Sequence, residues 1–361
     1  MDDSTGLHVF PAAGLTKAIA AIIAGGGSTG TEAAKVASSL VESNLRGHDS
    51  HGVGMVPRYV GALLDGGLRA NQQLTITLDG GSLLRVDGQR GYGQVMGEAA
   101  MQMAIERAAQ GGSCILALAN THHLGRIGQF AEIAAAAGFI SLSFVNVLSR
   151  PIVAPWGGSD GRFGTNPCCI GIPLPGEPPF ILDFATSKVA QGKLRVAHNR
   201  KEAVAPGLLL DDGGHSTTDP RFAVMPPLGA ILPFGEHKGY GLAIACELLG
   251  GALTGSGTEQ GVPRGDTRVV NGMLSIVIDP SRFGSSVLAA ESGAFLEWLR
   301  GSPPADGFDR VRLAGEPERE IRGHRLTHGI PIDATTWEAI GDAAEKVHLP
   351  RAAVERMARD T

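Results

Sequence analysis

The sequence predicts an α/β fold, because apolar runs of strand length alternate with patterns of helical spacing and because small residues fill the loops between them. Apolar runs occupy 114–119 and 139–145, and a helical pattern lies between them at 129–137. A strand, a helix and a second strand in this order are typical of an α/β sheet. The 52 glycines and 21 prolines among the 361 residues predict many tight turns.

The first third of the chain supplies two helices and then the first strands. Ala-rich patterns with helical spacing occur at 15–23 and 32–43. Alternating apolar residues at 74–78 and 83–86 predict a strand hairpin, and a helix over 94–110 follows it.

The glycine cluster between the first two helices satisfies the dinucleotide-binding pattern GxGxxG at 25–30, with Asp49 about twenty residues later. We interpret it instead as a helix C-cap and turn. The preceding apolar residues Leu15, Ile19 and Ile22 keep helical spacing, and the second strand of a βαβ unit does not follow. The cluster therefore does not predict a Rossmann fold.

The later part of the chain repeats the alternation of strands and helices. An apolar strand ends near Phe184, and Thr186 and Ser187 are good N-caps for a helix running through Val189. The other predicted elements are a loop and helix within 233–255, a strand at 273–279, and helices at 291–299 and 337–347.

Two histidines follow the apolar strand 114–119, in the segment THHLG at 121–125. The parallel sheet implied by the strand–helix–strand unit places this segment and Asn146 at the carboxyl edge, where open α/β sheets bind ligands. A histidine at this edge suits proton transfer, and the free N–H groups of the following helix suit a phosphate. These arguments do not choose between His122 and His123.

Other polar segments allow more than one interpretation. HDSHG at 48–52 suits a metal site, a Ser–His–Asp triad or a capped turn, but neither a second ligand cluster nor a GxSxG elbow accompanies it. Asn166 before Pro167 belongs to a structural loop or to a site. Lys238, at a helix start, is either solvent-exposed or an anion contact. Asp183 caps the next turn or holds a ribose hydroxyl.

Composition narrows the class of protein. The formal net charge is −5, with lysines and arginines spread along the chain, so we expect no nucleic-acid partner. The four cysteines match no zinc or redox spacing, which predicts a reducing compartment and no metal site. Because no apolar stretch is long enough to span a bilayer and no signal-like segment begins the chain, we expect a cytoplasmic protein without a membrane partner.

Seven segments, in order from about Leu15 to Pro331, together resemble a known family. They are LRGHDSHGVGMVPRYV, NTHHLGRIGQFAEIAAAAGF, RFGTNP, LDFATS, TTDP, EHKGYGL and the tail from GEPERE to GIPID. This set resembles the malate/L-lactate dehydrogenase family of NAD(P)-dependent oxidoreductases, and within it the hydroxycarboxylate dehydrogenase branch.

The resemblance implies a non-Rossmann dinucleotide-binding α/β fold of the L-sulfolactate/malate dehydrogenase type. It divides the chain into a helical N-terminal part with a substrate and cofactor segment at 1–72, a discontinuous α/β cofactor-binding and catalytic domain at 73–290, and C-terminal helices at 291–361 that pack with the N-terminal part. It also implies a homodimer, NAD as the cofactor with NADP as the alternative, and a small 2-hydroxy or 2-oxo acid such as malate or lactate as the substrate.

The resemblance also assigns roles to single residues. His123 is the acid and base, Ser50, His51 and Arg58 contact the substrate, and His51 also contacts the cofactor. The remaining cofactor contacts are Gly125, Arg126, Ile127, Ile181, Leu182, Asp183, Phe184, Ala185, Lys238, Asn271, Gly315, Glu316, Pro317 and Glu318.

One position departs from the family pattern. Many members place an arginine four residues after the DSHG histidine to hold the substrate carboxylate, and this chain has Met55 there. Arg58 lies nearby and is the expected substitute. Two other functions stay open, namely NADPH-dependent reduction of a cyclic imino acid of the piperideine-2-carboxylate type and non-catalytic nucleotide binding.

Overall fold

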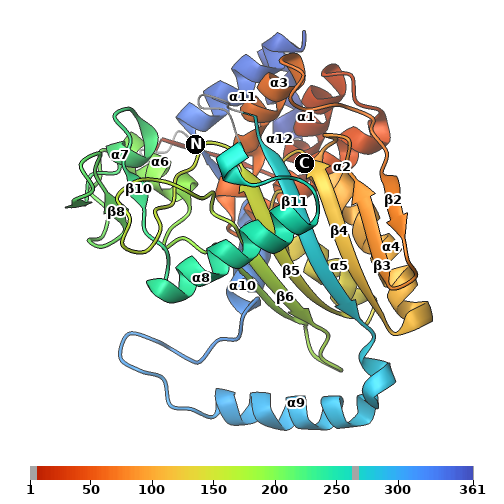
Figure 1. Ribbon diagram of the computed structural model, residues 1–361. Coiled ribbons are helices and arrows are strands. Elements are labelled where there is room, and N and C mark those ends of the chain that lie inside the picture. The colour runs from red at the N-terminus through yellow and green to blue at the C-terminus, as the bar shows by residue number, and fades with distance from the viewer. Residues whose placement is uncertain (1–5, 262–267, 361) are drawn as a thin grey trace.

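The computed structural model describes residues 6–261 and 268–360 and has the predicted α/β architecture (Figure 1). A seven-stranded mixed sheet forms its centre. A cluster of helices packs against one end of the sheet, and a small three-stranded sheet lies on another side of the molecule.

The central sheet has the strand order β2-β3-β4-β11-β5-β6-β7. Only β3 and β4 are parallel neighbours, because the other neighbouring pairs are antiparallel. The predicted hairpin is confirmed as β2 and β3. In sheet order the strands are β2 (Thr75–Asp79), β3 (Leu83–Asp87), β4 (Ser113–Thr121), β11 (Val270–Ile278), β5 (Ile140–Leu148), β6 (Cys168–Ile172) and β7 (Phe180–Phe184).

The expected parallel sheet is wrong for the strands that carry the candidate site. β4 and β5 are not neighbours, because β11 lies between them and pairs antiparallel with both. Six of the nine residues of β11 are buried and none is exposed, so a central place in the sheet suits this strand better than an edge. β4 and β5 still run in the same direction, and Asn271 of β11 pairs with both Thr121 and Val147 at their carboxyl ends.

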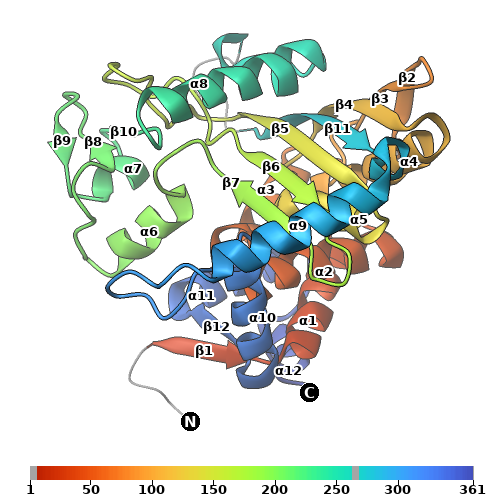
Figure 2. The same ribbon diagram turned by 90° about the horizontal axis from the view of Figure 1, so that it is seen from below.

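Helices cover both faces of the sheet (Figure 2). α4 (Gly93–Gly111) and α5 (Gly128–Ala136) pack on one face, and α8 (His237–Cys246) with the helical turn η3 (Glu247–Leu253) packs on the other. The helices expected at 15–23, 32–43, 94–110, 129–137, 291–299 and 337–347 are α1, α2, α4, α5, α9 and α11. Within the described ranges, none of the helices has the length and apolar character needed to cross a membrane.

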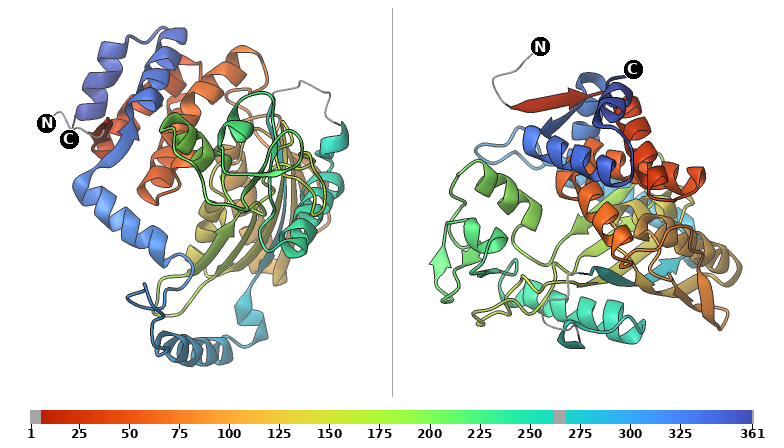
Figure 3. Two further views of the ribbon diagram at one scale, coloured as in Figure 1. Left: turned by 90° about the vertical axis from the view of Figure 1, so that its left-hand side faces the viewer. Right: turned by 90° about the horizontal axis from the view of Figure 1, so that it is seen from above.

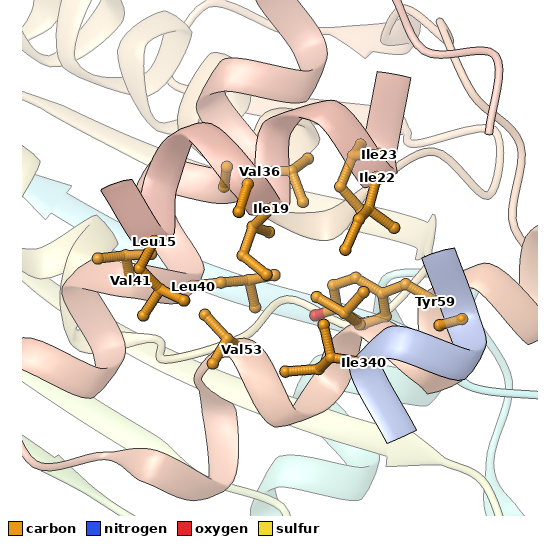
Figure 4. Packing of buried hydrophobic residues seen from close by; sticks show 14 of the residues in the cluster. Leu15, Ile19, Ile22, Ile23, Val36, Leu40, Val41, Val53, Tyr59 and Ile340 are labelled. Atoms are coloured by element: carbon orange, nitrogen blue, oxygen red, sulfur yellow. The ribbon is translucent and has the colours of Figure 1, made fainter. Parts of the chain in front are cut away.

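Residues from distant parts of the chain share one hydrophobic core (Figure 4). The core joins α1 (Ala12–Gly25), α2 (Gly30–Leu45) and α3 (Val56–Leu64) to α11 (Ala334–Lys346) and α12 (Arg351–Arg359). Helices α1 and α12 lie side by side in this cluster (Figure 3).

A short strand ribbon and one further helix adjoin this core, and the sequence pattern did not predict them. β1 (Leu7–Phe10) pairs antiparallel with β12 (Ile330–Asp333). α10 (Glu316–His328) contacts α2. By contrast, α9 (Ser285–Arg300) extends away from the helical cluster below the central sheet (Figure 1).

The interpretation of the glycine cluster as a helix end and turn is confirmed. α1 ends at Gly25, and Gly27 turns the chain with a φ of +97°. Thr29 then caps α2, because its hydroxyl accepts a hydrogen bond from the Glu32 N–H at 3.4 Å.

The helix expected after Phe184 does not form at the predicted place. Thr186 lies in a bend, Ser187 forms an isolated bridge with Pro233, and α6 (Gln191–Asn199) begins only at Gln191. The Thr186 N–H and hydroxyl both donate to the Thr165 carbonyl at 3.0 Å, which holds the segment against a neighbouring loop. The small sheet that follows contains β8 (Leu209–Leu210), β9 (Ser216–Thr217) and β10 (Ala230–Ile231), with α7 (Arg221–Val224) beside it.

We predict that Gly14→Ala destabilises the fold by about 1–3 kcal/mol, because the added methyl group overpacks the contact of α1 with α12. A Cβ at Gly14 would lie 2.6 Å from the Ala358 carbonyl oxygen. Urea unfolding measures the change. Gly61→Ala in α3 is the control, because a Cβ there meets nothing within 4 Å; it should raise stability by about 0.5–1 kcal/mol. Equal stability of the two variants would contradict the prediction.

Candidate functional site

His123 lies in the loop after β4, and its ring is hydrogen-bonded to a tyrosine that a glutamine also contacts. Its Nδ1 is 2.8 Å from the Tyr59 hydroxyl of α3, and the Gln94 amide of α4 donates to the same hydroxyl at 2.6 Å. The phenol oxygen has two lone pairs, so it can accept from Gln94 and from a hydrogen on Nδ1, and the neutral His123 ring that carries this hydrogen keeps a free lone pair on Nε2. Tyr59 therefore leaves Nε2 as the atom through which His123 can take up and release a proton.

Two further predicted residues lie beside His123. The His51 ring stacks on the His123 ring, with their centroids 5.6 Å apart and their planes at 13°. His51 ends the short helical turn η1 (Asp49–His51), and its Nδ1 is 2.9 Å from the Ser50 hydroxyl. The structure thus brings Ser50, His51 and His123 together.

Two other interpretations of the HDSHG segment, a Ser–His–Asp triad and a metal site, find no support in the described residues. The Asp49 carboxylate accepts from Arg325 of α10 at 2.6 and 3.0 Å and from the Asn44 amide at 2.7 Å, so it does not complete a triad with Ser50 and His51. No group of three or more His, Cys, Asp or Glu side chains suited to a metal ion occurs among the described residues. Asp49 instead ties η1 to α2 and α10.

The histidine loop is held in place by close backbone packing and by one buried amide. A Cβ at Gly93, the first residue of α4, would lie 2.6 Å from the His122 carbonyl oxygen, so only glycine allows this approach. The Asn271 side chain accepts from the Leu124 N–H at 2.8 Å and donates to the Asn146 carbonyl at 3.2 Å. Asn271 is thus a buried brace between β4, β11 and β5.

Burial keeps the three histidines of the site neutral. Desolvation, followed by the charges of His48 and Arg126, lowers the pKa of His51 to about 4. Desolvation also lowers the pKa of His122 to about 4, with a further contribution from the charge of Arg58. The pKa of His123 falls well below its ordinary value for the same first reason, and the charges of His51, His122 and Arg58 lower it further.

The two adjacent histidines have different surroundings. His122 is 1% exposed, neither of its ring nitrogens has a hydrogen-bond partner, and its ring meets the edge of Tyr59. His123 is partly exposed and makes the hydrogen bond to Tyr59. Of the pair, His123 is therefore the one placed for proton exchange with a bound molecule.

Several residues that the family resemblance assigns to the cofactor surround one small cavity, which we call the cofactor cavity. Its lining includes Arg126, Ile181, Asp183, Gly315 and Glu318, together with Arg46, His48, Glu132 and Arg319. The Glu318 Oε2 atom is buried and has no hydrogen-bond partner. An unpaired carboxylate oxygen of this kind suits a hydroxyl donor, such as a hydroxyl group of a ribose.

The expectation of free N–H groups at the start of α5 is wrong. The Gly128 N–H donates to Asp183 Oδ2 at 2.8 Å, and the N–H groups of Gln129 and Phe130 donate to backbone carbonyls. Asp183 thus caps α5 and not the turn that follows it. A phosphate would have to displace this carboxylate.

The other predicted contacts have mixed surroundings. Arg126 makes a bidentate ion pair with Glu132, with Nη1–Oε1 and Nη2–Oε2 distances of 3.1 and 2.7 Å. Ile127 packs in the core under the sheet, and Lys238 is exposed near the start of α8 and lines neither cavity. Leu182 and Phe184 belong to β7, and Ala185 follows it. Gly125 turns the histidine loop with a positive φ. Glu316 and Pro317 begin α10.

A second, larger cavity of about 220 Å³ contains the predicted substrate residue Arg58. We call it the arginine cavity, because Arg58, Arg150 and Arg195 line it together with Ser149, Gln191 and two aliphatic side chains. Met55, in contrast, packs against the helical core. The core therefore fills the position of the missing family arginine, and Arg58 is the cation that faces a cavity.

Sequence reasoning missed five residues of this region. Tyr59 ends the segment LRGHDSHGVGMVPRYV, for which no helix was predicted. Gln94 belongs to a helical pattern that indicates only packing, and Gly93 is one of many glycines. Arg150 follows the carboxyl end of β5. The expectation that ligands bind at the carboxyl edge of the sheet, which selected Asn146, therefore applies to Arg150 as well. Arg195 lies on a polar helix, and the sequence carries no signal that separates it from a solvated surface.

Comparisons with known proteins agree across nearly the whole chain. The family model described as malate/L-lactate dehydrogenase matches residues 10–341. Hydroxycarboxylate dehydrogenase B of Escherichia coli K12 is 44% identical over 95% of each chain, and the L-lactate dehydrogenase of Cupriavidus necator is 41% identical over 87% of this chain and 90% of its own. The solved sulfolactate dehydrogenase of Methanocaldococcus jannaschii superposes with a TM-score of 0.85 at 31% identity, covering 96% of this chain and 99% of that one.

We predict that the free energy of unfolding falls as the pH is lowered from 6.5 to 4, and that His122 causes part of this fall. Its folded pKa of about 4 lies below the unfolded value of 6.5, so the unfolded state binds the proton more readily and stability is lost on acidification. The contribution is at most about 3 kcal/mol.

His122→Leu should flatten this pH dependence, because leucine has no proton to bind. Denaturant unfolding at several pH values measures it, with His237→Leu as the control at an exposed histidine. If His122→Leu loses stability with acid as steeply as the parent chain does, His122 is not the buried neutral group described.

Proposed function

The chain belongs to the malate/L-lactate dehydrogenase family, and on this premise we propose that it is an NAD(P)-dependent oxidoreductase that interconverts 2-hydroxy and 2-oxo acids. The observation that supports the proposal most directly is the placement of His123. Its Nδ1 is bonded to Tyr59, its ring stacks on His51, and the charge of Arg58 acts on it. A proton-exchanging group beside a cation is what a hydroxy acid requires.

In the oxidation of a hydroxy acid, Nε2 of neutral His123 accepts the hydroxyl proton, and in the reverse reaction the protonated ring returns this proton from Nε2 to the developing alkoxide. Tyr59 keeps the ring in the productive tautomer by its bond to Nδ1. Arg58 binds the carboxylate of the acid, and Ser50 and His51 flank it. The nicotinamide ring, when bound, supplies or accepts the hydride.

The lowered pKa of His123 agrees with this assignment. At neutral pH the free site holds the base form, ready to take a proton from a hydroxyl group. The carboxylate of a bound acid adds a negative charge close to the ring, which raises the affinity of His123 for a proton during reduction.

For the cofactor we propose NAD, with NADP as the alternative, held along the segment of Gly125 to Ile127, the end of β7 and the start of α10. The unpaired Glu318 oxygen and Asp183 supply acceptors for ribose hydroxyls. We also propose that the family's non-Rossmann fold and its division at 1–72, 73–290 and 291–361 apply to this chain. The antiparallel β11 at the centre of the sheet supports this fold type.

We predict that His123→Ala lowers the turnover of a 2-hydroxy acid by two or more orders of magnitude while cofactor binding is retained. Tyr59→Phe should cost about tenfold, because it removes one hydrogen bond from the imidazole. Absorbance of the reduced cofactor measures turnover, and quenching of protein fluorescence measures cofactor binding. Unchanged turnover in His123→Ala would remove this residue from the mechanism.

A substrate panel with NADH and NADPH distinguishes the remaining functions. Reduction of 2-oxo acids supports the proposal. Faster reduction of a cyclic imino acid with NADPH would assign the chain to that chemistry. Binding of the cofactor without reduction of any member of the panel would identify a non-catalytic nucleotide-binding protein.

We further propose that the chain forms a homodimer through the face that carries α9. This helix extends from the body of the molecule, and its Phe295 and Trp298 stack on each other although 55% and 73% of their surfaces are exposed. Large exposed aromatic side chains on a projecting element are typical of an interface. A second copy of this chain is the partner that the family resemblance implies.

We predict that the double variant Phe295→Asp, Trp298→Asp converts the dimer to a monomer, because two charges would be buried in its interface. Light scattering after size-exclusion chromatography measures the mass. Leu64→Asp, at a leucine of α3 that is 61% exposed, is the control and should remain dimeric. A monomeric parent chain would refute the dimer itself.

A further inference from the structure

We propose that His324 and His328 form a surface site on α10 that binds one divalent transition-metal ion, such as Zn²⁺. Neither histidine takes part in the proposed reaction, so this inference stands apart from the proposed function. The expected absence of a metal site concerned the cysteines and the HDSHG segment, and the two histidines lie in neither. Water molecules would complete the coordination of the ion, as they do at other open metal sites.

The spacing of the two histidines suits a shared ion. His324 and His328 are four residues apart on α10, and residues at this spacing lie on one face of a helix, one turn from each other. Their rings stack with centroids 4.2 Å apart and planes at 20°. Two imidazole nitrogens on one tetrahedral Zn²⁺ are roughly 3.3 Å apart, because each Zn–N bond is about 2.0–2.1 Å long. The two rings are therefore almost as close as a common ion requires.

A second observation indicates that His328 is prepared as a metal ligand. Its Nδ1 is 2.9 Å from the carbonyl oxygen of His324. Because a carbonyl oxygen only accepts hydrogen bonds, Nδ1 carries a hydrogen, and the neutral ring presents its lone pair at Nε2. Histidines that bind metals usually donate their other ring N–H to an acceptor of this kind, which fixes the tautomer and strengthens the ligand. His328 thus has the hydrogen bond typical of a metal-binding histidine.

Both rings are accessible to an ion from solvent. His324 and His328 are exposed. Within residues 6–261 and 268–360, their rings make no ion pair and no hydrogen bond apart from that of His328 to the backbone. An incoming ion therefore displaces water and not a protein partner.

The arginines of α10 do not repel an ion at this site. Arg322 pairs with Glu42 of α2 at 2.8 Å, and Arg325 binds both carboxylate oxygens of Asp49 in η1. These contacts hold the two guanidinium groups on the face of α10 that packs against α2. Since successive residues of a helix are rotated by about 100°, the histidines lie on a different face. Their surroundings therefore do not oppose a second positive charge.

The end of the helix adds an attraction for a cation. His328 is the last residue of α10, and the free carbonyl groups of a last turn carry partial negative charge. Glu320 lies one turn before His324 on the same face, but its carboxylate is bonded to Arg310 and Arg312. The two imidazoles are thus the protein ligands of the proposed site.

The ligand set also determines which ions bind. Imidazole nitrogen suits Zn²⁺, Ni²⁺ and Cu²⁺, whereas Mg²⁺ prefers oxygen ligands and retains its water. The four cysteines are buried, so they do not compete for the ion in the folded chain. We therefore expect the site to bind Zn²⁺ and to ignore Mg²⁺.

The test is calorimetric titration of the untagged chain with ZnCl₂ after treatment with EDTA and dialysis. The parent chain should bind one Zn²⁺ at this site. His324→Ala and His328→Ala should each raise the Kd by about 100-fold or more, because the second imidazole meets an ion that the first already holds at high effective concentration. MgCl₂ should produce no binding. An unchanged Kd in both variants, or equal binding of Mg²⁺, would overturn the site.

A matched control keeps the number of histidines and changes only their spacing. The double variant His328→Ala, Leu326→His places the second imidazole two residues from His324, where side chains of a helix do not face each other. Leu326 is 51% exposed, so the fold tolerates a histidine there. This variant should bind Zn²⁺ as weakly as His328→Ala does. Binding as tight as that of the parent chain would show that the number of histidines, and not the pair, determines the affinity.

His348→Ala, at an exposed histidine outside α10, should keep the Kd of the parent chain, and a loss of binding there would move the site elsewhere. Turnover of a 2-hydroxy acid is measured on the same samples. It should be unchanged in His328→Ala, because the cofactor cavity is lined by the other end of α10, at Glu318 and Arg319. If Zn²⁺ binding and turnover were lost together, a separate surface site would be refuted. If the parent chain shows no turnover, the titration still tests the metal site.

Discussion

The site depends on one buried amide, that of Asn271. Strand β11 enters between β4 and β5, and its Asn271 joins the loop that carries the histidines to the carboxyl end of β5. Each of these hydrogen bonds is shielded from water, so removing the amide would leave buried backbone groups without partners. This brace and the close approach at Gly93 together hold the loop that carries His123.

Desolvation defines the electrostatics of the region. His51, His122 and His123 are crowded together near Arg58 and Arg126, so protonating any of them in the free protein is unfavourable. The same crowding favours anions. In the proposed mechanism, a carboxylate bound at Arg58 offsets the local positive charge and eases proton uptake by His123, which couples binding of the acid to readiness for its reduction.

Local patterns predicted every strand of the central sheet except β6, because burial imposes a period of two or of 3.6 on the apolar residues. Apart from the β2–β3 hairpin, they could not predict which strands pair. β11 lies far from β4 and β5 in sequence, and its place between them is determined by tertiary packing and not by a local pattern. The helix expected after Phe184 failed for a similar reason, since hydrogen bonds from the Thr186 N–H and hydroxyl to the Thr165 carbonyl hold Thr186 in a bend.

The candidate site was predictable in part. The order of the segments and the expected carboxyl edge of the sheet pointed to the histidine pair. The choice of His123 over His122 came from the family resemblance. The residues alone could not make this choice, because the burial of the His122 ring depends on how α4 packs against the loop at Gly93. Tyr59 and Arg195 left no signal. Their importance arises only when α3 and α6, each ordinary as a helix, are placed around the same loop.

The helical core that joins α1 and α2 to α11 and α12 has a consequence for synthesis on the ribosome. Residues 10–68 cannot complete their core until residues 330–358 have been made, because the two groups pack on each other. The central sheet likewise waits for β11. During translation the early helices thus expose apolar faces for most of the elongation time, which makes this chain a candidate for chaperone protection before its last helices emerge.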